Sequence, residues 1–302
     1  MPVSTAPATT PTATTPPATT ALVAPEGVNH HVFTHLEGFQ SLWRQEHRGW
    51  AEAVNRGLKR LALAGLQDPL SDQPAPPQRI AIVSRNCRET IEVDGVVSRQ
   101  RAQLLVLRRL IAAGELPPLG ELRCYLNEAI TGYADYLRRR CPELRCSEYL
   151  PEPDHPLRGV VPHRDVRRLN LPPASMHCLL CNEVLEHVEE LPPALSSMAE
   201  VLTLGGYLLA TVPLAYGQQA SIVKAVWRGE ELEPELLVEP EFHGDPVNPS
   251  QGSLVYRIPG WELLEQLKVA GFRRSELHLI SSARYGVLGA ELPYVFVLVA
   301  QR

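Results

Sequence analysis

A group of polar residues suited to acid–base chemistry follows the most apolar stretch of this sequence. Residues 176–181 form a short apolar run without Gly or Pro, as expected for a strand buried on both faces of a parallel sheet. Asn182 and Glu183 end the run, and Glu186 and His187 come within the next turn. Because an imidazole titrates near neutral pH, His187 suits a general base for an acceptor hydroxyl. The alternative interpretation is that Glu186 and His187 only support the loop.

A βαβ unit is predicted to position this group. Residues 191–202 have helical spacing of apolar side chains, Gly205 and Gly206 end that helix, and residues 207–212 read as a second strand. Open α/β sheets bind their ligands at the carboxyl ends of the strands. We therefore expect the polar group to lie at a ligand-binding edge.

Strands and helices alternate from residue 122 to the C-terminus, which predicts a doubly wound α/β sheet. Only residues 151–158 join the second and third strands, so the usual helix there is expected to be missing. The further strands are predicted at 122–126, 144–149, 159–162, 276–281 and 294–300, and the further helices at 131–140 and 261–270.

Three parts are predicted along the chain. Residues 1–27 are almost entirely Thr, Ala and Pro, with too little apolar surface to offset ordering entropy, and we expect them to be disordered. Residues 28–116 form an extension of helix, hairpin and helix, and residues 117–302 hold the α/β domain. An irregular insertion at 214–255 is expected to act as a lid or binding loop. Within the extension we predict a helical region at 36–66, a linker at 67–77, strands at 79–84 and 90–93, and a helix at 98–113.

Composition limits the class of protein. The 302 residues carry a formal net charge of −5, which gives no general reason to expect a nucleic-acid partner. No apolar run reaches the length of a membrane span, and the N-terminus lacks the basic start and apolar core of a signal peptide. We therefore expect a cytoplasmic protein.

The cysteines are expected to be buried, reduced thiols. Cys178 and Cys181 have the spacing of half a zinc site, but a strand sends residues three apart to opposite faces. No second pair has convincing spacing, so the sequence predicts no metal site.

Residues 122–302 resemble the class I S-adenosylmethionine-dependent methyltransferases, particularly the type 11 branch. The segment 181–188, CNEVLEHV, is similar to that branch's fourth motif, and 200–206, EVLTLGG, to the segment that follows it. Residues 163–166, HRDV, resemble the third motif. Segments 241–246 and 260–264 resemble a bacterial subgroup associated with glycosyltransferases and surface-glycan synthesis. The resemblance implies a Rossmann-like, mostly parallel sheet with an antiparallel last strand.

The resemblance also implies a site for S-adenosylmethionine, although the family's glycine-rich first motif is replaced here by the segment 127–132, NEAITG. Its candidate cofactor residues are Asn127, Glu128, Thr131 and Gly132. Glu128 suits the cofactor's ammonium group, and the amides near Thr131 and Gly132 suit its carboxylate at a helix N-terminus. The alternative is that Thr131 simply caps the helix.

Other residues acquire expected roles from the same resemblance. Glu148, at the end of the second strand, would hold the ribose hydroxyls, and Asp165 the adenine amine. Asn182 and Glu183 would lie beside the transferring methyl group. The alternatives are a solvated Glu148 and a loop-capping Asp165. His177 replaces the family's usual Asp and is expected to be a buried, neutral imidazole.

The sequence says less about the residues that would bind the methyl acceptor. His187 and His243 are the candidate catalytic bases, and Asp245 is a candidate for acceptor contact. A basic stretch either attracts an anionic acceptor or is merely solvated. It consists of the arginines at 138, 139, 140, 145, 158, 164, 167 and 168. Residues 97–102 resemble the segment after a cysteine-knuckle hairpin in the same subgroup, but only Cys87 remains there, so no metal is supported.

The function implied is methyl transfer from S-adenosylmethionine, by direct displacement, to an oxygen of a sugar, a glycan or another small molecule. Association with glycan-synthesis enzymes is a further expectation. The first alternative is a degenerate methyltransferase fold kept as a binding or scaffold protein. The second is a nucleotide-sugar or dinucleotide enzyme, which the absence of a Gly-x-Gly-x-x-Gly turn disfavours.

Overall fold

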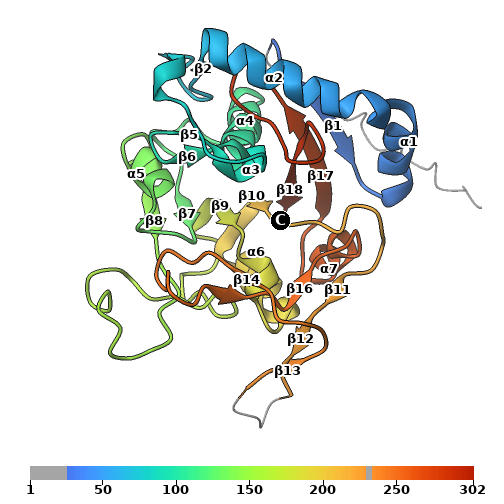
Figure 1. Cartoon of the computed structure of the whole chain (residues 1–302). Helices are drawn as coiled ribbons and strands as arrows, with labels where there is room; N and C mark the ends of the chain where they lie inside the picture. The colour runs from blue at the N-terminus through green and yellow to red at the C-terminus, as the bar shows by residue number, and fades with distance from the viewer. Residues whose placement is uncertain (1–25, 229–232) are drawn as a thin grey trace, which may run out of the picture.

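The computed structural model describes residues 26–228 and 233–302, so nearly all of the predicted disordered tail lies outside the described residues. Its centre is a 7-stranded sheet in the order β1-β17-β18-β10-β9-β7-β8 (Figure 1). The strands are β1 (Asn29–Phe33), β7 (Cys124–Leu126), β8 (Leu144–Cys146), β9 (Met176–Asn182), β10 (Leu202–Thr211), β17 (Arg274–Ser281) and β18 (Val295–Gln301).

The directions of the strands confirm the predicted fold class. β8, β7, β9 and β10 run parallel to one another, whereas β18 is antiparallel to both β10 and β17. The sheet is therefore Rossmann-like and mostly parallel, with an antiparallel last strand. The apolar run of β9 lies in the middle of this sheet, where neighbours on both sides and helices on both faces bury it.

Helices cover both faces of the sheet. α4 (Ser98–Ala112) and α5 (Gly132–Arg138) pack on one face, and α1 (Leu36–Glu46), α6 (Leu191–Val201) and α7 (Leu263–Val269) on the other. From Cys178 to Cys181, successive β9 residues alternate between the two cores, and each fully buried leucine contributes about 1.5–3 kcal/mol. Cys178 and Cys181 accordingly belong to opposite cores, as predicted, and neither forms a disulfide.

The N-terminal extension contains the predicted helices and hairpin. After a 3-10 turn at His47–Gly49, α2 (Trp50–Ala64) crosses the top of the molecule as drawn in Figure 1. A short hairpin and a small sheet follow. They consist of β2 (Leu66–Gln67), β3 (Pro74–Ala75), β4 (Ala81–Ile82), α3 (Cys87–Thr90), β5 (Ile91–Val93) and β6 (Val96–Val97).

One strand of the main sheet escapes sequence reasoning. β1 pairs antiparallel with β17 and so forms an edge of the central sheet. Its sequence, NHHVF, contains only two apolar residues and carries no strand signal of its own. Pairing with β17 decides its conformation.

The predicted third strand at 159–162 is wrong as a strand. What remains are two isolated parallel bridges, one between Arg158 and Val161 and one between Glu148 and His163. Four prolines at 151, 153, 156 and 162 remove backbone donors from this segment, which prevents a regular ladder. The absence of the usual helix is confirmed, since residues 147–175, all of them described, contain none.

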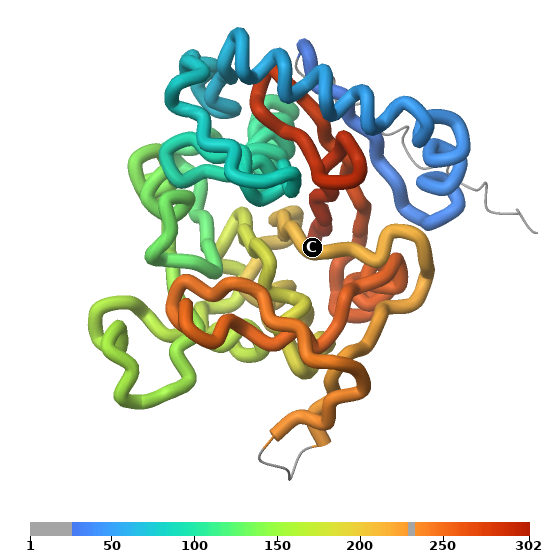
Figure 2. The backbone as a smooth tube through the Cα atoms, in the orientation of Figure 1, coloured from blue at the N-terminus to red at the C-terminus, as the bar shows by residue number. Residues whose placement is uncertain are grey.

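The insertion at 214–255 is less irregular than predicted. Three two-stranded pairs organise it. Figure 2 traces the course of this segment, most of it in orange. They join β11 (Ile222–Val223) to β16 (Arg257–Ile258), β12 (Ala225–Val226) to β13 (Glu235–Leu236), and β14 (Phe242–His243) to β15 (Ser253–Leu254). Strands of two residues are too short to show periodicity in a sequence. Across the described ranges, no helix has the length and apolar character needed to span a membrane.

Candidate active site

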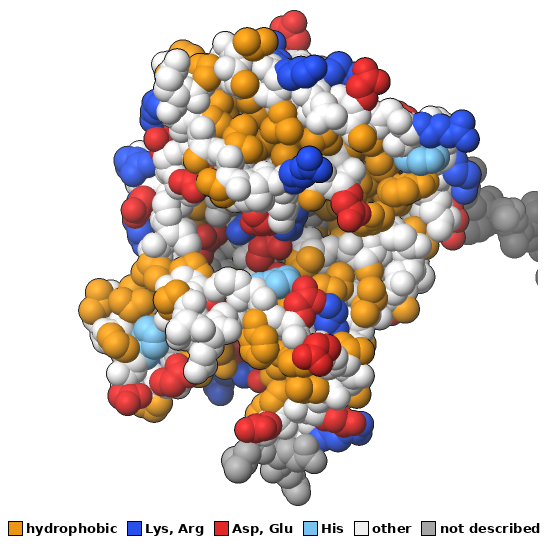
Figure 3. Space-filling view, viewed as in Figure 1, with side chains coloured by type: hydrophobic (Ala, Val, Ile, Leu, Met, Phe, Trp, Pro, Cys, Tyr) orange, Lys and Arg blue, Asp and Glu red, His pale blue; other side chains and the backbone are white. Residues whose placement is uncertain are grey.

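A cavity of about 350 Å³ opens at the carboxyl ends of β7, β8 and β9. Figure 3 shows this face hollowed across its middle, with acidic and basic side chains gathered in the hollow. The walls come from the loops after these three strands, from the extension around residues 95–100, and from insertion residues 244–247. The structure brings every predicted cofactor residue except Gly132 to this wall: Asn127, Glu128, Thr131, Glu148, Asp165, Asn182 and Glu183.

Two polar side chains in the loop after β7 differ in their hydrogen bonding: Glu128 has partners within the protein and Asn127 has none. Glu128 accepts hydrogen bonds from Thr131 Oγ1 at 2.6 Å and from Asn182 Nδ2 at 2.8 Å. Thr131 also caps α5 by accepting from the amide of Ala134 at 3.2 Å. The neighbouring Asn127 differs, because both polar atoms of its side chain are buried without a hydrogen-bond partner. A ligand in the cavity therefore has an amide available to it at Asn127.

Gly132 lies away from the cavity wall and packs against the extension. A Cβ built on Gly132 would stand 2.5 Å from the Cα of Gly95, in the turn between β5 and β6. A side chain at either position would push the two backbones apart. The structure thus gives Gly132 a packing role between the extension and α5.

Glu148 joins the loops after β8 and β7. Its Oε1 accepts from the amides of Ala129 at 2.6 Å and Ile130 at 3.1 Å. Burial raises the pKa of Glu148 despite these amide hydrogen bonds, which act in the opposite direction. Glu148 is therefore a buried residue of the wall rather than an ordinary solvated glutamate.

Asp165 is paired with Arg167. Burial alone would raise the pKa of Asp165, but the hydrogen bonds from Arg167 outweigh it and the pKa is lowered. The amide of Arg167 donates to Asp165 Oδ1 at 2.8 Å, so Asp165 caps its loop while also lining the cavity.

Glu183 is held by an arginine of the extension. It adopts a left-handed backbone with a φ of 49°, which is uncommon for a residue with a side chain. Arg88 donates from both terminal nitrogens to its carboxylate, Nη1 to Oε2 at 2.8 Å. Burial opposes ionisation, yet the charges of Arg88 and Arg99 lower the pKa of Glu183 to about 2.

Sequence reasoning missed both of these arginines. Arg99 Nε donates to Glu89 Oε2 at 2.7 Å, whereas its Nη1 is buried at the cavity without a hydrogen-bond partner. The available signal was the basic character of the segment that begins α4. Nothing local in the sequence says that this segment reaches the carboxyl end of β9.

The two candidate bases meet at one carboxylate. His187 Nε2 and His243 Nδ1 each lie 3.7 Å from Glu186 Oε1. Glu186 is 0% exposed and neither of its oxygens has a hydrogen-bond partner. His187 lines the cavity and His243 lies outside its wall.

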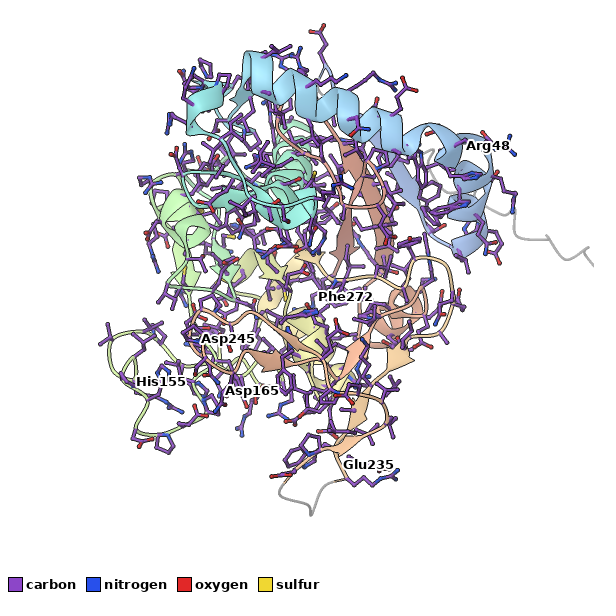
Figure 4. All side chains as sticks on the ribbon, viewed as in Figure 1. Arg48, His155, Asp165, Glu235, Asp245 and Phe272 are labelled. Carbon is purple, nitrogen blue, oxygen red and sulfur yellow. The ribbon has the colours of Figure 1, made fainter. Side chains whose placement is uncertain are left out.

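Asp245 also reaches the cavity. Its carboxylate accepts from Ser253 Oγ at 2.7 Å and from the amide of Val247 at 2.9 Å. Figure 4 shows Asp245 near Asp165 and His155, where the insertion meets the long loop after β8. His155 contacts the carbonyl of Val247 at 3.3 Å, which ties the two segments together.

His177 lies outside the cavity wall, and so do most arginines of the basic stretch. His177, near the start of β9, is half-buried rather than buried, because it lies at the opposite end of the strand from the cavity. Burial and nearby Arg123 lower the pKa of His177, which favours the predicted neutral form. Within the basic stretch, Arg164 and Arg167 line the cavity, while Arg138 and Arg158 donate to loop carbonyls.

Two comparisons with known sequences gave one match. A family model described as "Methyltransferase domain" matches residues 144–210. A search of curated proteins gave no significant match.

Solved structures of methyltransferases resemble the chain at low sequence identity. An S-adenosylmethionine-dependent methyltransferase from Mesorhizobium loti is 13% identical with a TM-score of 0.43, covering 68% of this chain and 98% of that one. The 1,6-didemethyltoxoflavin-N1-methyltransferase of Burkholderia thailandensis, solved with S-adenosylhomocysteine, is 16% identical with a TM-score of 0.36, covering 68% and 78%. The match to the methyltransferase-domain model covers residues 144–210, which include β8, β9 and most of β10 of the Rossmann-like sheet.

Proposed function

We propose that this protein is an S-adenosylmethionine-dependent methyltransferase that acts on an oxygen of a sugar, a glycan or another small molecule. The observation that carries the proposal is Asn127, whose amide nitrogen and oxygen are both buried at the cavity without partners. Leaving such a group unpaired costs about 1–3 kcal/mol. A ligand that brings both a donor and an acceptor removes this cost, and the amino-acid end of the cofactor brings both.

The remaining wall residues fit the rest of the cofactor. Arg99 Nη1 would hold the methionyl carboxylate together with Asn127, since it is a buried cation without a hydrogen bond at that atom. Glu148 uses Oε1 for two amides, which leaves Oε2 for the ribose hydroxyls, and Asp165 would accept from the adenine amine. The cavity volume of about 350 Å³ lies within the usual range for small-molecule sites, about 300–1,000 Å³.

The chain's own contribution to the reaction is alignment and proton removal. The bound cofactor supplies an electrophilic methyl group on a sulfonium, and the protein aligns an acceptor behind it and excludes water. An acceptor hydroxyl must lose its proton, and the cluster of Glu186, His187 and His243 lies beside the cavity to promote that loss. His187 and His243 are therefore the proposed catalytic residues.

The acceptor side of the cavity suits a hydroxyl-rich molecule. Glu189, Asp245 and Ser253 line it and present oxygens that accept or exchange hydrogen bonds. Association with glycan-synthesis enzymes and a cytoplasmic location stay predictions from the sequence.

Calorimetry with S-adenosylmethionine tests the cofactor assignment on the full chain. We expect saturable binding, weakened about tenfold or more by Asn127→Leu, since losing one good hydrogen-bonded contact is worth about 1.4 kcal/mol. Asn55→Ala, on the exposed face of α2, is the matched control and should bind as the wild type does. A wild-type protein that shows no binding up to about 1 mM would instead favour the scaffold alternative.

Two further measurements resolve the finer assignments. A Glu148→Ala variant with wild-type affinity would remove the ribose assignment. Transfer of labelled methyl groups to a panel of sugars, nucleotide sugars and amines would identify the acceptor class, and label only on amines would overturn the oxygen assignment.

A further inference from the structure

Glu186 is a carboxylate that the fold leaves without a counterion at bonding distance. It belongs to the 3-10 turn Leu185–His187 and is 0% exposed, and neither Oε1 nor Oε2 has a hydrogen-bond partner. Burying a bare carboxylate costs several kcal/mol. A cation placed beside Glu186 would remove that cost.

The hydrogen bonds of the two neighbouring imidazoles decide which nitrogens face Glu186. His187 Nδ1 lies 2.7 Å from the carbonyl oxygen of Leu254, which only accepts, so Nδ1 carries the proton. In the neutral imidazole, His187 Nε2 then presents a lone pair toward Glu186 Oε1, at 3.7 Å.

His243 repeats this arrangement with the opposite nitrogen. Its Nε2 lies 3.0 Å from Glu241 Oε1, and an ionised carboxylate only accepts, so Nε2 carries the proton. His243 Nδ1 is left with a lone pair, also 3.7 Å from Glu186 Oε1. When both imidazoles are neutral, one carboxylate and two imidazole lone pairs thus converge.

We propose that Glu186, His187 and His243 bind a divalent transition-metal ion, with Zn²⁺ as the first candidate. One ligand atom from each residue lies within 4.8 Å of the other two, and within 26–228 and 233–302 no other such group of three or more occurs. Two imidazoles and one carboxylate with an open position is a ligand set that Zn²⁺ and Fe²⁺ use in catalytic sites. Histidines that ligate metals usually donate their second nitrogen to a carbonyl or carboxylate, as both do here.

The position of the cluster suggests what the ion does. His187 lines the proposed acceptor side of the cavity, so an ion on its Nε2 would lie next to an acceptor hydroxyl and make it more acidic. The histidines would then act as ligands rather than as bases. This role depends on the proposed methyl transfer, whereas metal binding itself does not.

The test measures metal uptake by the tag-free full chain. After treatment with a chelator, the protein is titrated with Zn²⁺ and with Co²⁺ by calorimetry, and bound metal is counted by mass spectrometry. We expect one ion per chain and a Co²⁺ spectrum without thiolate bands, because the cysteines lie outside the cluster.

Variants locate the ion. Glu186→Gln and His243→Gln should abolish high-affinity binding, and Glu241→Gln, which removes only the outer hydrogen bond, should weaken it about 10–100-fold. The matched control is His35→Gln, an exposed histidine that should leave binding unchanged. Thermal unfolding with and without Zn²⁺ checks folding, since only variants that bind the ion should gain stability from it.

A wild-type chain that takes up neither Zn²⁺ nor Co²⁺ would falsify the proposal and leave the cluster as a proton-holding site. Equal binding by His243→Gln and His35→Gln would overturn it as well. Binding of S-adenosylmethionine is measured on the same samples. Metal uptake without cofactor binding defeats only the proposed function, and cofactor binding without metal uptake defeats only this inference.

Discussion

Glu183 and Glu186 follow the same strand, yet the fold treats their two carboxylates in opposite ways. Glu183 receives Arg88 through both terminal nitrogens, and the pKa of Glu183 is lowered to about 2. Glu186 has no hydrogen-bond partner, and burial raises its pKa. The difference teaches that the N-terminal extension supplies a counterion to Glu183 but not to Glu186. Glu186 faces the imidazoles of His187 and His243 and the ligand that we propose they bind.

Removing the partner of Glu183 should have the largest effect. Arg88→Ala leaves a largely buried carboxylate without its bidentate donor, which costs about 3–5 kcal/mol for buried pairs. Urea unfolding measures the loss. Arg56→Ala, which breaks the exposed pair with Glu52, is the control and should cost about 1 kcal/mol or less. Equal losses in both variants would contradict the burial argument.

The pH dependence of stability should separate wild type from Glu183→Gln. The folded pKa of Glu183 lies below its ordinary value of 4.5, so the ionised carboxylate stabilises the fold above that value. This contribution, about 3 kcal/mol at neutral pH, should be lost as the pH falls from 4.5 toward about 2. Unfolding free energies of both proteins at several pH values check it, and a constant gap between them would rule out this ion pair as the cause.

The same chemical change at Glu186 should have the smallest effect. In metal-free protein Glu186→Gln removes a buried charge that lacks a hydrogen bond, so stability should stay within about 1 kcal/mol of wild type or increase. Urea unfolding in the presence of a chelator measures this. A loss as large as that of Glu183→Gln would mean that the two carboxylates are held alike.

Periodicity and chain punctuation predicted most of the elements. The apolar run of β9 and the helical spacing of α6 are local signals, and the structure follows them. The prediction that Gly205 and Gly206 end the helix is wrong, because α6 ends at Val201 and both glycines lie inside β10, where the pairing with β9 is irregular. The end of β9 was also predictable from the sequence, because Asn182 and Glu183 end its apolar run. Residues at the ends of parallel strands meet at one edge of a sheet, which is why seven of the eight predicted cofactor residues line one cavity.

The wrong or missing strand predictions share a cause, which is that partner strands and prolines, rather than apolar periodicity, decide these segments. β1 has no apolar pattern and becomes a strand only because β17 offers it an unpaired edge. The pairs in the insertion are two residues long, too short to alternate visibly. The segment at 159–162 had strand-like residues, but the prolines in and before it left only isolated bridges.

By itself the sequence determined most strands of the sheet, the chemical types at the strand ends and the cap that Thr131 places on α5. Each of these depends on residues within a turn or a strand of one another. Only the tertiary structure decided which acids would be neutralised. Arg88 and Glu183, or His243 and Glu186, meet across long stretches of chain, and such pairings depend on packing and on the cost of burying charge rather than on any local pattern. The structure thereby brought the two predicted bases together with Glu186 in one cluster, placed Arg99 in the cavity wall and paired Arg88 with Glu183.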